Sequence, residues 1–173
     1  MSVGIEGGLG SGKTLMMARY LALDFMRHHR RVYSNFWLDF DYTKLDVRDM
    51  LKKKENLKDV SVGIDELTVF ADCRSSMSEL NKLISYFVLQ TRKRNVCLYY
   101  TTQDFGMVDK RIIQHTLVRV FCSKVKGKPD DYPMRRYEIL DIRDSFTNPP
   151  QVFYMDIRPY FNLYNTDEII EPW

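Results

Sequence analysis

Apolar residues follow two patterns along this chain: short continuous runs, and longer runs with a helical period. Short apolar runs predict strands, whereas apolar residues three or four positions apart predict helices that bury one face. The predicted strands are Ser2–Glu6, Arg31–Phe36, Val60–Ile64, Asn95–Thr101 and Leu117–Lys124, followed by extended stretches at Arg136–Ile142 and Val152–Ile157. The predicted helices are Gly12–Arg27 and Ser78–Arg92. Because strands alternate with helices, the pattern predicts an α/β fold with a mostly parallel sheet and helices on both faces.

Composition and charge add only a little to what the hydrophobic pattern predicts about the fold and its partners. The chain has 173 residues, of which 45% are hydrophobic and 28% charged, as in an ordinary globular domain. We therefore expect a single domain spanning residues 1–173. A formal net charge of +3 permits an anionic partner without requiring one. Cys73, Cys97 and Cys122 lack metal-site or disulfide spacing, which favours free thiols in the cytoplasm. No apolar run is long enough for a membrane helix, so we expect no membrane span.

The sequence GGLGSGKT has the spacing of a phosphate-binding loop. It follows a short apolar strand and begins an amphipathic helix, which is the context that this motif requires. Its glycines allow backbone N–H groups to surround a phosphate, and the helix N-terminus favours negative charge. Lys13 is expected to bridge the terminal phosphates and Thr14 to bind Mg²⁺ through its hydroxyl. The predicted nucleotide-binding residues are Gly7, Gly8, Leu9, Gly10, Ser11, Gly12, Lys13, Thr14 and Leu15.

Two acids follow the predicted buried strand VSVGI. At this position Asp65 is expected to hold Mg²⁺ through water, and Glu66 to polarise a water that attacks the γ-phosphate. Kinases of small molecules usually exclude that water, so the acid pair favours hydrolysis over phosphate transfer. At the end of the strand CLYYTT, either Thr102 or Gln103 is placed to contact the γ-phosphate, and we favour Gln103.

Taken together, these motifs resemble the FtsK/HerA branch of the RecA-like P-loop ATPases. The segments LQTRKRNVCLYYTTQ and VDKRIIQHTLVRVFCSK are similar to the FtsK pattern, and PYFNLYNTDEII resembles the end of the ATPase domain in zonula occludens toxin-like proteins of filamentous phages. The resemblance implies the additional-strand RecA-like fold, with a twisted sheet of strand order 5-1-4-3-2 in the numbering of the predicted strands, and extra C-terminal strands. It also implies a homo-oligomeric ring, expected to be a hexamer, in which ATP hydrolysis with Mg²⁺ moves double-stranded DNA.

Several tasks are compatible with such a motor. If Trp173 is its natural end, the chain is a bare motor, which favours viral genome packaging in the host cytoplasm, with a capsid or membrane-associated viral protein as a further partner. The alternative within the family is phage assembly and extrusion of the zonula occludens toxin-like type. Alternatives from other classes are a P-loop kinase, for which the sequence shows no arginine-rich lid, and a nucleotide-binding scaffold without turnover.

Two segments with arginines are candidates for further roles, and a third, mixed-charge segment is not. In ADCRSSMSEL, Arg74, Ser75 and Ser76 suit contact with DNA phosphates without reading of bases. In TRKRN, Arg92 and Arg94 occupy the place where the FtsK pattern also has arginines, and the resemblance implies a finger that reaches a neighbouring subunit's phosphates. The alternative is that these cations complement a helix C-terminus. The segment 124–136 is expected to form a plain surface hairpin.

Overall fold

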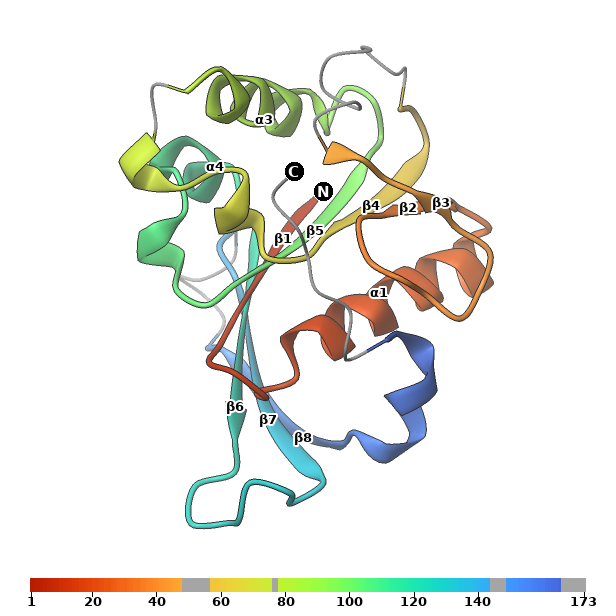
Figure 1. The fold of residues 1–173 in the computed structure, drawn as a ribbon, viewed down its shortest axis with the longest axis vertical. Coiled ribbons are helices and arrows are strands. Elements are labelled where there is room, and N and C mark those ends of the chain that lie inside the picture. The colour runs from red at the N-terminus through yellow and green to blue at the C-terminus, as the bar shows by residue number, and fades with distance from the viewer. Residues whose placement is uncertain (48–56, 76–77, 144–148, 166–173) are drawn as a thin grey trace.

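The computed structural model describes residues 1–47, 57–75, 78–143 and 149–165 (Figure 1). These residues form an eight-stranded sheet with the order β3-β2-β4-β5-β1-β6-β7-β8. The strands are β1 (Ser2–Glu6), β2 (Arg31–Ser34), β3 (Thr43–Lys44), β4 (Val60–Ile64), β5 (Cys97–Thr102), β6 (Val118–Lys124), β7 (Met134–Asp141) and β8 (Gln151–Asp156). Pairing is parallel from β3 to β6, and antiparallel from β6 through β7 to β8.

The central part of this sheet confirms the predicted strand order. Strands β6, β1, β5, β4 and β2 are the fifth, first, fourth, third and second predicted strands, lying side by side in that order. The sheet differs in detail at its edges, where the short β3 joins β2 and the two expected C-terminal strands are β7 and β8. Strand β2 ends at Ser34, two residues earlier than predicted, because the Ser34 hydroxyl accepts the Phe36 N–H at 3.2 Å and turns the chain.

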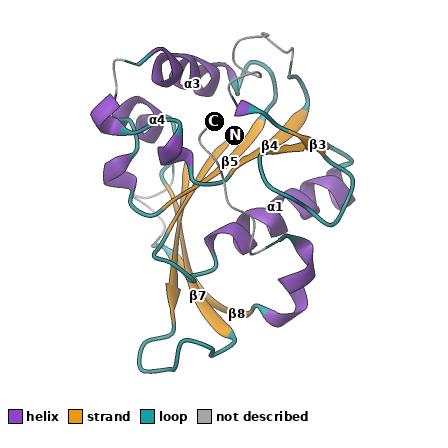
Figure 2. Cartoon of the chain, in the orientation of Figure 1, coloured by secondary structure: helices purple, strands orange, loops and turns teal. Residues whose placement is uncertain are grey.

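Helices cover both faces of the sheet, as the alternating pattern predicts (Figure 2). On one face lies α1 (Lys13–His28), and on the other lie α3 (Glu79–Gln90) and α4 (Lys110–Gln114). The short 3₁₀ helices are η1 (Leu67–Val69), η2 (Cys73–Ser75), η3 (Phe105–Met107) and η4 (Arg158–Leu163). Helix α1 ends at the left-handed His29 (φ 51°) with basic residues in its last turn, and α3 begins at Ser78, whose side chain accepts the Asn81 N–H.

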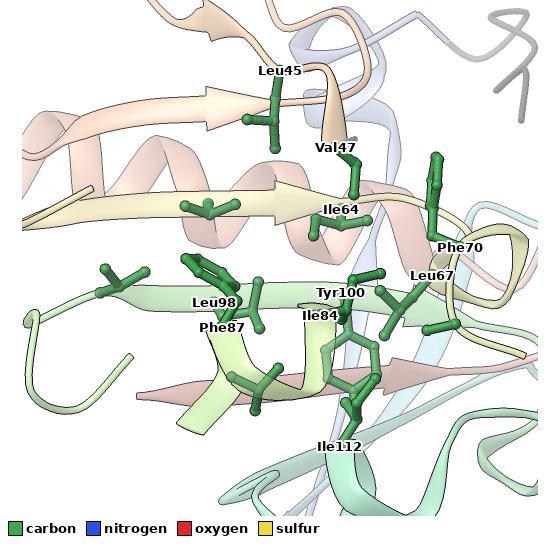
Figure 3. Packing of buried hydrophobic residues seen from close by; sticks show 14 of the residues in the cluster. Leu45, Val47, Ile64, Leu67, Phe70, Ile84, Phe87, Leu98, Tyr100 and Ile112 are labelled. Carbon is green, nitrogen blue, oxygen red and sulfur yellow. The ribbon is translucent and has the colours of Figure 1, made fainter. Parts of the chain in front are cut away.

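Each face of the sheet has its own apolar core. Successive side chains of a strand point to opposite faces, so Leu98 and Tyr100 enter the core under α3 and α4, whereas Tyr99 enters the core under α1. Figure 3 shows the first core, in which Leu98 and Tyr100 of β5 lie near Ile84 and Phe87 of α3. The two cores hold a layer of helices against each face of the sheet.

Within the described ranges, no helix has both the length and the apolar character needed to cross a membrane.

Candidate nucleotide site

The segment GGLGSGKT forms a tight loop between the carboxyl end of β1 and the start of α1 (Figure 1). Gly10 and Gly12 adopt left-handed φ angles of 68° and 91°, which side chains with a Cβ rarely adopt. At Gly12, an added Cβ would lie 2.5 Å from the Tyr137 hydroxyl oxygen. The loop is also tied to its neighbour strand, because the Gly7 N–H donates to the Thr102 carbonyl at 3.3 Å. The predicted cradle is therefore formed and fixed by its surroundings.

Two polar side chains of this loop fit an anionic ligand. The Lys13 side chain is buried and its ammonium donates to the Gly8 carbonyl at 3.2 Å, which leaves donors for phosphate oxygens. The Ser11 hydroxyl is buried and has no hydrogen-bond partner among the described residues. A buried polar group without a partner is costly. Both observations fit phosphate oxygens as the natural acceptors at this loop.

Thr14 and Asp65 bring together oxygen atoms of the kind that Mg²⁺ prefers. The Thr14 hydroxyl lies 3.2 Å from each carboxylate oxygen of Asp65. The backbone of Asp65 is held by Asn35, whose side-chain oxygen accepts the Asp65 N–H at 2.7 Å and whose amide donates to the Asp65 carbonyl at 3.1 Å. No group of three or more metal-binding side chains occurs in the described ranges. An ion bound here would complete its shell with phosphate oxygens and water, as Mg²⁺ commonly does.

The pKa values of both acids, Asp65 and Glu66, are raised. Burial raises the pKa of Asp65, against the opposing effect of hydrogen bonds from Thr101 and Thr14. Burial and the neighbouring Asp65 charge raise the pKa of Glu66, while Lys13 lowers it. Glu66 also has a left-handed backbone (φ 50°, ψ 57°). Such conformations cost about 1–3 kcal/mol and cluster at functional sites. A nearby cation would favour the ionised form of both acids.

Thr101 joins both acids, and the sequence analysis missed it. Its hydroxyl donates to the Asp65 carboxylate at 2.5 Å and accepts the Glu66 N–H at 2.9 Å. Thr102, which we considered instead, points to the other face of β5, and its hydroxyl donates to the Asp104 carbonyl at 2.9 Å. Gln103 is exposed immediately after β5. Strand alternation could have identified Thr101 from the sequence. Residues two positions apart on a strand point to the same face, so Thr101 lies with Tyr99 on the face that α1 covers.

The other predicted site residues lie away from this cluster. Arg74, in η2, is exposed, and its guanidinium is paired with Asp72 at 2.8 Å. Ser75 is the last residue of η2, and Ser76 lies outside the described residues. Arg92 and Arg94 follow α3 at the amino end of β5, which is the opposite edge of the sheet from the phosphate loop. The structure thus unites Lys13, Thr14, Asp65 and Glu66, and it separates the arginines from them.

The segment 124–136 is a hairpin, as predicted, but it is more than a surface feature. Its strands β6 and β7 pair antiparallel, and Arg135 donates from Nε to the Gly10 carbonyl at 2.9 Å. The prediction of a plain hairpin was therefore incomplete, because a contact between residues 125 positions apart leaves no local pattern in the sequence.

Comparison with known proteins identifies solved structures that share this fold. No family model and no curated relative matches the sequence. Among solved structures, the N-terminal domain of zonular occludens toxin from Neisseria meningitidis matches with a TM-score of 0.71 and 19% identity, over 94% of this chain and 97% of that one. The genome packaging NTPase B204 from Sulfolobus turreted icosahedral virus 2, in complex with ATP-gammaS, matches with a TM-score of 0.60 and 10% identity, over 90% and 96%. EssC (ATPases 2 and 3) from Geobacillus thermodenitrificans matches with a TM-score of 0.60 and 13% identity, over 99% and 41%.

The chain has the fold of the FtsK/HerA-like P-loop ATPases. The three solved structures cover between 90% and 99% of this chain, so the similarity extends over the sheet and its helices as a whole. The RecA-like fold class predicted from the motifs is confirmed.

Proposed function

We propose that this protein is a Mg²⁺-dependent ATPase that hydrolyses ATP at the loop between β1 and α1. Lys13 would bind the terminal phosphate oxygens, and Thr14 and Asp65 would hold the metal ion. When bound, Mg²⁺ neutralises charge on the phosphates. Glu66 would accept a proton from the attacking water as general base. The structural neighbours, which include ATPases and an NTPase in complex with ATP-gammaS, support this assignment.

The observation that carries the proposal is the hydroxyl of Thr101 between the two acids. It fixes Asp65, which contacts Thr14, and at the same time fixes the backbone of Glu66. A scaffold that merely bound nucleotide would need the metal acid but not a second, strained acid beside it. The paired arrangement favours water activation over both a kinase and a scaffold without turnover.

Steady-state phosphate release from ATP tests this proposal. Lys13→Ala should lower turnover by about 10²–10³, the typical effect of losing one donor at developing phosphate charge. Glu66→Gln should retain affinity for Mg²⁺ and ATPγS while nearly stopping release. Lys110→Ala and Glu79→Gln, both at exposed positions, serve as matched controls and should behave as wild type. Wild-type turnover by Lys13→Ala would remove the loop from the mechanism. Normal hydrolysis by Glu66→Gln together with lost Mg²⁺ binding would mean that the two acids have exchanged roles.

We further propose that hydrolysis moves double-stranded DNA. The motif resemblance and a neighbour described as a genome packaging NTPase support this task. Genome packaging is our first candidate, and phage assembly and extrusion is the second, favoured by the higher TM-score of the zonular occludens toxin domain. If Arg74 contacts a DNA phosphate, Arg74→Ala should flatten the slope of log affinity against log salt by about 0.9. Loss of DNA affinity in wild-type protein even at low salt would favour another polymer.

A ring of identical chains is the assembly that this proposal requires. Arg92 and Arg94 lie at the amino end of β5, so a phosphate within their reach would belong to a neighbouring copy. Turnover per chain should then rise steeply with protein concentration. Mixing Arg94→Ala with Glu66→Gln should restore part of the activity, because one mixed interface pairs an intact site with an intact finger. Turnover that stays flat across a dilution series of monomeric protein would contradict the trans finger, but would leave the ATPase proposal standing.

A further inference from the structure

Arg135 of β7 is a buried arginine that contacts the phosphate loop. The residue is buried, with 7% of its surface exposed. Nε donates to the Gly10 carbonyl at 2.9 Å, Nη1 to the Met134 carbonyl at 3.0 Å and also to the Tyr132 carbonyl, and Nη2 to the Asp130 carbonyl at 3.3 Å. In the described part of the chain it forms no ion pair at salt-bridge distance. The nearby Asp130 carboxylate is paired instead with Lys124 at 2.8 Å.

Tyr137, two residues further along β7, contacts the same loop. Its hydroxyl donates to the Gly12 carbonyl at 3.4 Å, and its side chain is fully buried. Because side chains alternate along a strand, Arg135 and Tyr137 lie on one face of β7. They meet the loop at Gly10 and Gly12, the two positions with left-handed backbone. We call this pair the β7 brace.

The brace determines which way the loop amides point. In a trans peptide unit the carbonyl and the following N–H point in opposite directions. A carbonyl of Gly10 held by Arg135 therefore turns the Ser11 N–H away from the hairpin. The Gly12 carbonyl accepts both the Met16 N–H of α1 at 3.0 Å and the Tyr137 hydroxyl at 3.4 Å, so the first helical bond and the brace together turn the Lys13 N–H away from the hairpin. The Ser11 N–H already points back into the loop, because it donates to the Gly8 carbonyl at 3.3 Å. These amides belong to the set that would face a bound phosphate.

We propose that Arg135, together with Tyr137, is a positioning residue for the nucleotide phosphates, a role that rests on the nucleotide binding proposed above. The guanidinium has five N–H donors, and it makes four hydrogen bonds, each to a backbone carbonyl. It therefore acts through the loop rather than as a phosphate ligand. Its positive charge, buried and without a bonded carboxylate in the described ranges, adds to the attraction for an anion at the loop.

Binding of Mg²⁺·ATPγS by isothermal titration tests the brace. Arg135→Gln should weaken binding by about tenfold or more, the usual worth of a charge-assisted hydrogen bond. Arg135→Lys keeps the charge and one bond to the Gly10 carbonyl, and should lose no more than about threefold. The matched control is Arg136→Gln, because Arg136 lies on the opposite face of β7 and pairs with Glu138 at 2.7 Å. It should bind as wild type does. Rescue by lysine separates a charge effect at the loop from a general loss of packing.

A second variant keeps the test decisive if Arg135→Gln does not fold. Tyr137→Phe removes a hydroxyl and leaves the ring, and should accelerate hydrogen exchange of the Lys13 amide in the nucleotide-free protein. Wild-type exchange and wild-type affinity in Tyr137→Phe would overturn the brace, as would wild-type affinity in a folded Arg135→Gln. In both cases, lost binding by Lys13→Ala would show that the nucleotide site itself stands. A wild-type protein that binds no ATPγS would instead overturn the proposed function.

Discussion

Replacing Thr101 by valine should disable both acids without changing the shape of the strand. Valine has nearly the same volume as threonine but lacks the hydroxyl that donates to Asp65 at 2.5 Å and accepts from Glu66 at 2.9 Å. The site is fully buried, so water is a poor substitute for the lost partner. The Asp65 carboxylate would lose its shortest hydrogen bond, and the strained backbone of Glu66 would lose the contact that holds its N–H.

The magnitude follows from the kind of hydrogen bond that is lost. A bond to a charged group contributes about 1.5–3 kcal/mol. Because about 1.4 kcal/mol corresponds to a factor of ten, the ionised, metal-binding form of Asp65 should be disfavoured by about 10- to 150-fold. Affinity for Mg²⁺·ATPγS should fall within this range. Turnover should fall further, because Glu66 is displaced in the same variant.

Isothermal titration and phosphate release measure these two quantities. Thr101→Ser keeps the hydroxyl and should recover most of both. Thr102→Val is the matched control, since the Thr102 hydroxyl bonds to the backbone of Asp104 and not to either acid. Affinity and turnover both unchanged in Thr101→Val would refute the assignment of Thr101 as the residue that positions the acid pair.

Three further changes have expected outcomes. Gly12→Ala places a Cβ at φ 91° and 2.5 Å from the Tyr137 hydroxyl, so urea unfolding should show a loss of more than about 1 kcal/mol, whereas Gly8→Ala, which meets no atom within 4 Å, should show little. Asp65→Asn should raise the free energy of unfolding at neutral pH, because burial raises the pKa of Asp65 and the folded state disfavours its charge. The same variant should lose Mg²⁺-dependent nucleotide binding. A lower melting temperature would contradict the stability prediction. Asp109→Ala removes the cap that accepts the Arg111 N–H at 2.9 Å and should cost about 1 kcal/mol. Because Arg111 lowers the pKa of Asp109, this stabilisation is present above about pH 4 and is lost as pH falls through the lowered pKa, so wild type and variant should converge in acid.

Motifs with fixed local spacing account for most of what the sequence could predict. The phosphate loop and the acids after β4 lie in continuous segments whose chemistry is fixed by neighbouring residues, and the order of the five central strands followed from the family resemblance. Thr101 was missed because the run Thr101-Thr102-Gln103 offers three polar side chains, and a shift of one residue exchanges the faces of a strand. Asn35 and Arg135 were missed for a different reason. They bond to backbone groups 30 and 125 positions away, and such contacts leave no periodicity.

The cations around the phosphate loop differ in their availability. Lys13 makes one hydrogen bond, to the Gly8 carbonyl, and can turn to a phosphate. Lys124 lies beside Gly10, but its ammonium is paired with Asp130 at 2.8 Å. Arg135 donates to four backbone carbonyls. Lys13 and Lys124 therefore each keep donors for an anion, and of the two Lys13 is buried in the loop itself, whereas the donors of Arg135 are largely used by backbone carbonyls.

This difference separates two arginine roles that activity measurements alone would confuse. Stabilising the charge that develops on a transferred phosphoryl group commonly takes a second cation, and an arginine finger contributes about 10³–10⁵ in rate. Arg135 is committed to the loop and is unsuited to that task, which favours the proposal that Arg92 or Arg94 of a neighbouring copy supplies the finger. Loss of the brace should therefore weaken nucleotide affinity in a single chain. Loss of the finger should leave affinity intact and reduce turnover in the assembled state, because the finger acts on charge that appears only during the reaction.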